Sequence, residues 1–311
     1  MKILIYGGTG FIGTWLTSAL AEANLVSNLG MELTVITRDI KAAASHFRNS
    51  HAVQISFLEH DFGSGPLKRK LSADYIFHGA TPSRVLTGSS DLKGVIVGSV
   101  NAALHAVSCR SSFRPIPSVI HLSSGIIYGP QEMGMGFREE NDFAKSSTNE
   151  YAEAKLQVEK ILQNAYESGQ IKYQSPRLFA FTGPLLQLDA HFAIGNFLRD
   201  GLTGQAISIN GNPGTIRSYM YPADLVVSLL AVATQDKYQN INIGSDVPIS
   251  MLELATLISK MTENTRIKLP TSYPEPTNYV PSVKNLRAII PDYQFTPLED
   301  ALQKWINWIK S

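Results

Sequence analysis

A tyrosine and a lysine four residues apart could together move a proton. Tyr151 and Lys155 stand in the segment YAEAK, within a run from 151 to 165 whose apolar residues have helical spacing. Residues four apart lie on one face of a helix. A phenol has a pKa of about 10, and an ammonium one helical turn away favours the phenolate. Such pairs also occur on ordinary helix surfaces, so the rest of the chain must decide the role of this one.

A glycine-rich turn near the N-terminus could hold a phosphate. Gly7, Gly10 and Gly13, in GGTGFIG, follow an apolar run at 2–7 and open a helical pattern at 11–23. Glycines let the backbone turn tightly and approach a pyrophosphate, and the start of a helix offers free N–H groups with a partial positive charge. Between a strand and a helix, this pattern indicates a dinucleotide site.

Alternating apolar runs and helical patterns define the fold class. We expect strands at 2–7, 32–38, 53–61, 73–80, 118–124 and 173–181, and helices at 11–23, 97–109 and 151–165. The alternation predicts an α/β fold, a Rossmann-type doubly wound parallel sheet with right-handed crossovers. Turn signals become dense further on, so we expect a cofactor-binding domain over 1–182. A smaller, mainly substrate-binding lobe should cover 183–311, although segments may cross back.

Composition excludes several kinds of partner. The 311 residues include 27 basic and 26 acidic residues, a formal net charge of +1, which argues against nucleic acid or a membrane surface. The single cysteine, Cys109, excludes an internal disulfide and fits a reducing compartment. No apolar run reaches the ~18 residues of a membrane span, and the N-terminus lacks signal-peptide features. We expect a cytoplasmic protein with no membrane partner and no metal site.

The order of the motifs resembles the extended branch of the short-chain dehydrogenase/reductase superfamily, which acts mainly on sugar nucleotides. The glycine spacing, HGAT at 78–81, HLSSGIIYG at 121–129 and the Tyr-x-x-x-Lys pair are each similar to a family segment. The resemblance implies a nucleotide-sugar substrate and a homodimer. It implies catalytic roles for Ser124, Tyr151, Lys155 and Asn101, and substrate contacts from Ser124, His191 and Arg217. It implies cofactor contacts from Gly7, Gly10, Phe11, Ile12, Gly13, Arg38, Asp61, Phe62, Ala80, Tyr151 and Lys155.

The chemistry explains why these residue types are needed. Interconversion of a carbinol and a ketone moves a proton at oxygen, for which Tyr151 is the candidate donor and acceptor. Lys155 would lower the pKa of that phenol, and Ser124 would donate to the substrate oxygen where negative charge develops. Asn101, by the resemblance, would distort its helix and hold a relay water. Arg217 would meet a phosphate of the nucleotide.

The end of the second strand favours NADP over NAD. Thr37 stands where NAD enzymes usually place a carboxylate for the ribose, and Arg38 follows with a planar fork that suits a 2′-phosphate. Asp39 is the counterargument, because it could serve the ribose after a shift of two residues. We expect NADP as the cofactor, with NAD as the alternative.

The resemblance leaves epimerisation, 4,6-dehydration, decarboxylation and reduction open. Gly125 and Ile126 stand where dehydratases carry an Asp-Glu pair, so dehydration is disfavoured. An NADP preference favours net reduction, so we rank a 4-keto sugar-nucleotide reductase above an NAD-dependent 4-epimerase. A non-catalytic NADP-binding sensor or scaffold is the alternative of a different class. Ala180 replaces a family Asn and a late family Arg has no match, so the nucleotide stays open.

Overall fold

The computed structural model describes residues 1–47, 55–81, 92–109, 116–129, 131, 136–139, 150–189, 192–237, 240–264 and 266–311. These residues belong to two compact units, each built from three segments of the chain. The first comprises Met1–Ile127, Lys145–Arg177 and Leu229–Ile241, and the second comprises Tyr128–Ala144, Leu178–Ser228 and Asn242–Ser311. The assignment of cofactor binding to one part of the chain and substrate binding to the other stays a prediction.

The first half of the chain alternates strands and helices as expected. Its elements are β1 Lys2–Tyr6, α1 Phe11–Ser27, β2 Glu32–Thr37, α2 Ile40–His46, β3 Ile55–Glu59, the 3-10 turn η2 Phe62–Ser64, β4 Tyr75–His78, α3 Leu92–Ser108, β5 Ser118–His121, β6 Ser123–Ser124, the 3-10 turn η4 Gly125–Tyr128, α4 Glu150–Glu167 and β7 Lys172–Leu178. The expected strand at 118–124 is divided at Leu122 into β5 and β6. Helix α2 was not predicted.

The main sheet of the described residues has eight strands in the order β10-β7-β5-β4-β1-β2-β3, with β6 paired to β7. The pairs β1–β2, β2–β3, β1–β4, β4–β5 and β5–β7 are parallel. The strand order reverses between β1 and β4, and ligands of doubly wound folds bind outside the carboxyl ends of the strands at such a point. The predicted fold class is therefore confirmed.

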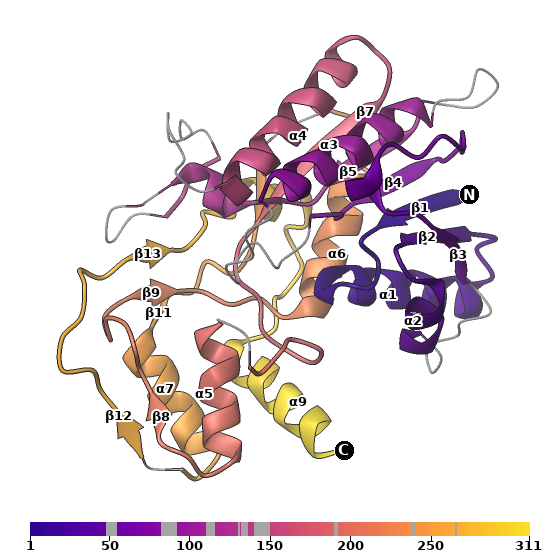
Figure 1. The fold of residues 1–311 in the computed structure, drawn as a ribbon. Coiled ribbons are helices and arrows are strands. Elements are labelled where there is room, and N and C mark those ends of the chain that lie inside the picture. The colour runs from indigo at the N-terminus through magenta and orange to yellow at the C-terminus, as the bar shows by residue number, and fades with distance from the viewer. Residues whose placement is uncertain are drawn as a thin grey trace. The chain divides into compact units, whose positions relative to one another are not determined.

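Helices cover the sheet of the first unit on both faces. Figure 1 shows α3 and α4 side by side on one face and α1 and α2 on the other. A buried cluster fills the space under α3 and α4, with Ala102, Ala106, Val158 and Leu162 from the helices packed on strand residues such as Ile76. This packing fixes the face of α4 that is turned toward the sheet.

The second unit contains shorter elements. They are α5 Ala193–Leu202, β8 Ile207–Ser208, β9 Ile216–Arg217, α6 Pro222–Ala233 (which continues into the first unit), β11 Ile249–Ser250, α7 Met251–Met261, β12 Ile267–Lys268, β13 Asn278–Tyr279, α8 Lys284–Ile289 and α9 Leu298–Lys310. Strand β10, Asn240–Ile243, spans the division between the units. In the second unit, β9 pairs with β11 and β13, and α5, α7 and α9 share a core around the buried Trp305.

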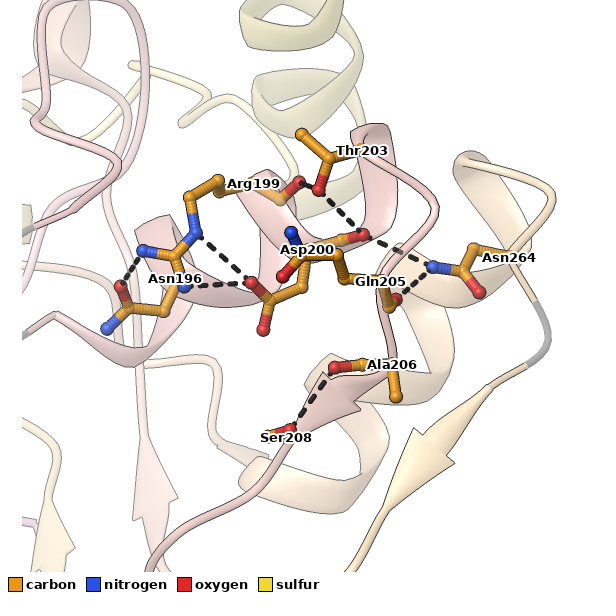
Figure 2. Close-up of polar contacts among 8 residues, drawn as sticks. All are labelled: Asn196, Arg199, Asp200, Thr203, Gln205, Ala206, Ser208 and Asn264. Atoms are coloured by element: carbon orange, nitrogen blue, oxygen red, sulfur yellow. Dashed lines mark hydrogen bonds and ion pairs between the residues drawn. The ribbon is translucent and has the colours of Figure 1, made fainter.

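Side chains of Asn264 and Thr203 bond to carbonyl oxygens at the C-terminal end of helix α5, as Figure 2 shows. Asn264 donates through Nδ2 to the carbonyl oxygens of Asp200 and Gln205, at 3.3 and 2.5 Å. The hydroxyl of Thr203 donates to the carbonyl oxygen of Arg199 at 2.9 Å. The last carbonyls of a helix lack partners within the helix, so these bonds define where α5 stops.

No helix among the described residues is both long and apolar enough to cross a bilayer. No group of three or more histidine, cysteine or acidic side chains in the described ranges is arranged to hold a metal ion.

Candidate active site

The glycine turn after β1 is held by close backbone packing at the point where the sheet order reverses. Gly7 has a φ of +78°, and a Cβ there would lie 2.7 Å from the carbonyl oxygen of Gly79, which follows β4. A Cβ on Gly13 would overlap the carbonyl oxygen of Gly7. Side chains are therefore excluded at Gly7 and Gly13 by the protein's own backbone.

Gly10 differs, because nothing in the first unit requires a glycine there. It is exposed, it caps α1, and an added Cβ would lie 3.5 Å from its nearest neighbour, the carbonyl oxygen of Gly7. Helix α1 begins with no side-chain cap and no acidic residue in its first turn. Its positive end and the N–H groups of Phe11 and Ile12 are thus available to an anion. An open glycine at an uncapped helix start fits a dinucleotide pyrophosphate.

The residues after β2 hold a helix start. Strand β2 ends at Thr37, and both Arg38 and Asp39 are exposed. The Asp39 carboxylate accepts from the backbone N–H of Ala42 at 2.9 Å and so caps α2. This cap explains the position of Asp39 without a ligand. The cap uses one oxygen of the Asp39 carboxylate. The second oxygen of this exposed side chain lies beside the end of β2.

Asp61, Phe62 and Ala80, the other expected cofactor contacts, also have structural partners. Asp61 caps η2 by accepting from the N–H of Gly63 at 2.9 Å. The Phe62 ring is buried, with its centroid 5.2 Å from that of Tyr6, so only its backbone could reach a cofactor. Ala80 is half-buried and follows β4.

Asn101 behaves differently from the expectation. Helix α3 runs unbroken from Leu92 to Ser108, so the expected distortion at Asn101 is absent. The side-chain amide donates to the carbonyl oxygen of Phe62 at 2.8 Å and ties α3 to η2. A role in holding a relay water stays a prediction.

The predicted Tyr/Lys pair faces the sheet from α4. Lys155 is buried, with 2% exposure, and its Nζ lies 5.5 Å from the centre of the Tyr151 ring. Lys155 Nζ also donates to the carbonyl oxygen of Leu122 at 2.6 Å. Leu122 precedes β6, which contains the half-buried Ser124, and α4 packs on β6. The structure therefore places the Tyr/Lys pair and the strand end that carries Ser124 against one another.

Burial, more than mutual charge, controls the protonation of the pair. Burial raises the pKa of Tyr151 to about 12 and lowers the pKa of Lys155 to about 7, while the charge of Glu159 raises the latter. Desolvation penalises both charged forms in this state, and a lowering of the Tyr151 pKa by Lys155 stays a prediction. At neutral pH Tyr151 is a phenol able to donate a proton.

Arg217, the expected phosphate contact, lies in the second unit on β9. Its guanidinium donates to the carbonyl oxygen of Ile216 at 2.8 Å and to the hydroxyl of Thr277 at 3.1 Å. It also lies 5.9 Å from the centre of the Tyr279 ring, and burial lowers its pKa. Its phosphate role stays a prediction. His191 lies outside the described residues.

Sequence reasoning missed three buried titratable residues beside Lys155. His78 and His121 are register partners on β4 and β5, with ring centroids 5.0 Å apart. Glu159 is buried on α4 and pairs with Arg177. A spacing of four from Lys155 to Glu159 was the available signal, because it repeats the spacing from Tyr151 to Lys155.

This combination defines the class of protein. A glycine turn at the switch point of a parallel sheet, with a Tyr/Lys pair beside a serine after β5, is the arrangement of a short-chain dehydrogenase/reductase of the extended branch. The chain belongs to the NAD dependent epimerase/dehydratase family, whose model matches residues 3–244. The family and enzyme class expected from the sequence are confirmed.

Individual relatives are similar over nearly the whole chain. UDP-glucuronic acid decarboxylase 1 of Danio rerio is 24% identical over 99% of this chain and 72% of its own length. UDP-glucuronic acid decarboxylase 5 of Arabidopsis thaliana is 26% identical over 93% of this chain and 84% of its own length. Both are similar proteins, and neither identity fixes the reaction of this chain.

Solved structures share the fold. A UDP-N-acetylglucosamine 4-epimerase from Methanobrevibacter ruminantium M1, in complex with UDP-N-acetylmuramic acid, superposes with a TM-score of 0.84 at 21% identity, covering 99% of this chain and 98% of its own. A UDP-glucuronic acid 4-epimerase from Bacillus cereus, in complex with UDP-glucuronic acid and NAD, gives 0.80 at 20% identity, covering 100% and 99%. The family description and this complex both name NAD, so the expected NADP preference finds no support.

Proposed function

We propose that this enzyme uses NAD to oxidise and then re-reduce a carbinol carbon of a UDP-sugar within one binding event, as a 4-epimerase does. The observation that carries the proposal is the pair of half-buried Tyr151 and buried Lys155, in which Lys155 bonds to the carbonyl oxygen of Leu122, two residues before Ser124. Such a site moves one proton at one oxygen, and Gly125 and Ile126, the residues that follow Ser124, add no second acid or base. The relatives and solved structures described above are named for UDP-sugars, which supports UDP as the nucleotide.

The residues divide the work at the substrate oxygen. Ser124 would donate a hydrogen bond to that oxygen, and Tyr151 would return its proton to the ketone as general acid. Protonated Lys155 would favour the Tyr151 phenolate during the oxidative half of the cycle. NAD, when bound, accepts and returns the hydride, and Gly10, Phe11 and Ile12 at the start of α1 would hold its pyrophosphate.

Dehydration is disfavoured by the residues that follow Ser124. Gly125 and Ile126 form part of η4 and carry no group that transfers a proton. Glu159 does not replace them, because its carboxylate is buried and bound to Ser123 and Arg177. Neither Gly125 and Ile126 nor Glu159 therefore supplies the acid and base needed to remove water from the sugar.

Decarboxylation is a second candidate, favoured by the curated relatives that are named UDP-glucuronic acid decarboxylases. Oxidation of C4 of a glucuronate produces a ketone β to the C6 carboxylate. A β-keto acid loses carbon dioxide without a further acid–base pair, so Ser124, Tyr151 and Lys155 would suffice for the chemistry on this chain.

Net reduction of a 4-keto sugar nucleotide, our first expectation from the sequence, depended on the NADP preference. It now has weaker support than the redox-neutral reactions, because the family and the neighbours point to NAD. A reductase would consume reduced cofactor in step with substrate, which separates it from both candidates above.

Incubation with UDP-sugars distinguishes these functions. Purified enzyme with NAD is offered UDP-glucose, UDP-glucuronate and UDP-N-acetylglucosamine, and the products are followed by proton NMR. We expect a C4 epimer with no net NADH. A UDP-pentose with carbon dioxide would identify the decarboxylase, and consumption of NAD(P)H with a 4-keto sugar nucleotide would identify the reductase. No turnover of any substrate would reject the proposal, with Tyr151→Phe as the inactive control.

A further inference from the structure

Glu159 continues the line of functional residues along α4. Tyr151, Lys155 and Glu159 are spaced by four, so they lie on one helix face, and Glu159 is buried with 6% exposure. A buried carboxylate is costly unless it is paired, so its partners show what holds its charge in place.

Both oxygens of the Glu159 carboxylate are engaged. The Ser123 hydroxyl donates to Oε1 at 2.5 Å, and Arg177 Nη2 lies 3.2 Å from Oε2. These contacts hold the carboxylate in one position between Ser123 and Arg177. Ser123 is the residue before Ser124, so Glu159 also fixes the short strand that carries the expected catalytic hydroxyl.

Among the described residues that act on Lys155, Glu159 carries the negative charge. Tyr151 and Glu159 face it from α4, His78 from β4 and His121 from β5, while Arg177 on β7 reaches it through Glu159. Burial lowers the pKa of His78 to about 3 and that of His121 well below its usual range, so both histidines are neutral. Glu159 is the negative charge that favours protonated Lys155.

We propose that Glu159 is a positioning residue that keeps the Lys155 ammonium protonated beside Tyr151 and, through Ser123, fixes the backbone that carries Ser124. The role belongs to the proposed proton transfer and rests on it. Glu159 touches neither substrate nor cofactor in this scheme and acts through Lys155. Arg177 pairs with the buried carboxylate and holds it in place.

The negative charge of Glu159 can be removed while its hydrogen bond from Ser123 is kept. Glu159→Gln keeps an amide oxygen for Ser123 but leaves the buried Arg177 cation with a neutral partner, which can destabilise the chain. The double variant Glu159→Gln, Arg177→Met removes both charges of the pair, a change that buried ion pairs often tolerate. Glu153→Gln is the matched control, because Glu153 is an exposed residue of the same helix.

The titration of Lys155 tests the proposal without any turnover. Protein labelled with [ε-13C]lysine is titrated by NMR, and Lys155→Arg assigns the signal. We expect Glu159→Gln and the double variant to lower the midpoint of Lys155 by about one pH unit or more, the size expected for loss of a nearby opposite charge. Glu153→Gln should leave it in place, and Glu159→Asp should restore much of the shift.

The pH profile of kcat links that titration to the reaction. Its alkaline limb should move to lower pH together with the Lys155 midpoint. The proposal would be overturned if Lys155 titrated with the wild-type midpoint in both Glu159→Gln and the double variant. It would also be overturned if these variants lost activity while the alkaline limb of the kcat profile stayed at the wild-type pH. If no UDP-sugar is turned over, the proposed function fails, but the NMR midpoints still decide whether Glu159 sets the protonation of Lys155.

Discussion

Lys155 Nζ donates a hydrogen bond to the carbonyl oxygen of Leu122 at 2.6 Å, and this bond joins the helix of Tyr151 to the strand end of Ser124. The lysine is buried, so its ammonium depends on acceptors inside the fold such as this carbonyl oxygen. Because the acceptor is a backbone atom, its position follows from the sheet itself. The fold therefore sets the separation of the three expected catalytic groups before any ligand binds.

Replacing Tyr151 by phenylalanine should remove the proton donor and leave the fold unchanged. We expect Tyr151→Phe to lower kcat by ~10²-fold or more, with NAD affinity within about twofold of the wild type. Product formation by NMR and cofactor titration by fluorescence measure the two effects. Tyr166→Phe, near the other end of α4, is the control. A kcat equal to the wild type would exclude Tyr151 as the acid–base group.

Replacing Lys155 by methionine should remove activity and make the fold more stable at pH 7. Its pKa falls from 10.5 when exposed to about 7 in the fold, so between these values the unfolded chain binds more protons. Its ionisation therefore opposes folding most at pH 7 or below and least near pH 10.5. We expect Lys155→Met to abolish turnover and to raise the free energy of unfolding at pH 7 by on the order of 1–3 kcal/mol.

Urea unfolding at pH 7 and at pH 10 checks that sign. The stability gain of Lys155→Met should shrink at the higher pH, which lies close to the pKa of 10.5 of this lysine in the unfolded chain. Lys160→Met, at an exposed position on the same helix, should show no such gain. A loss of stability at pH 7 in Lys155→Met would show that its hydrogen bond to Leu122 outweighs the cost of burial.

Substitutions of Gly13 and Gly10 should affect different properties: the first should lower stability, and the second should weaken cofactor binding. Gly13→Ala meets the backbone of Gly7 and should cost about 2 kcal/mol or more in stability. Gly10→Ala meets no close neighbour and should change stability by no more than about 1 kcal/mol, yet weaken NAD by about tenfold. Thermal unfolding and calorimetric titration measure both. Normal NAD affinity in Gly10→Ala would remove Gly10 from the cofactor site.

The sequence was sufficient for the sheet and for the identity of the Tyr/Lys pair. Apolar runs bounded by glycines locate buried parallel strands, and their order follows from the crossover rule. Helix α2 escaped prediction because it has only seven residues, and Asp39, which caps it, was considered only as a possible ribose contact. A polar residue after a strand can cap the next helix or contact a ligand, and only the folded backbone distinguishes these two roles.

The protonation of the site could not be predicted from spacing. The sequence shows that Tyr151 and Lys155 are neighbours, which by charge alone lowers the pKa of the tyrosine. Burial depends on how α4 packs on the sheet, and it dominates both groups. Glu159 was missed for the same reason, because a glutamate in a helix is usually exposed and only tertiary packing shows this one to be buried.

The residues after β2 allow a direct test of cofactor choice. If NAD is the cofactor, the wild type should bind NAD more tightly than NADP. Arg38→Ala should weaken NADP much more than NAD, because only NADP carries a 2′-phosphate for the guanidinium. Asp39→Asn keeps an oxygen for the cap of α2 and should weaken NAD alone if the carboxylate holds the ribose. Equal losses of both cofactors in Arg38→Ala would remove Arg38 from the choice.

Acid should destabilise the protein through its buried histidines. Neither ring nitrogen of His121 has a hydrogen-bond partner among the described residues, and burial holds its pKa well below the usual range. Below pH ~6.5 the unfolded chain takes up a proton that folded His121 does not, so stability falls by about 1.4 kcal/mol per pH unit. His78 adds a similar loss that ends near its folded pKa of about 3.

Replacing His121 by phenylalanine should reduce this acid sensitivity. Urea unfolding is compared for the wild type and His121→Phe at pH 7.5 and pH 5. At pH 7.5, where the histidine is neutral in both states, the variant should be as stable as the wild type, because an apolar ring replaces two unpaired nitrogens. At pH 5 the variant should retain about 2 kcal/mol more stability. Equal losses from pH 7.5 to pH 5 in the two proteins would show that His121 becomes protonated within the folded chain.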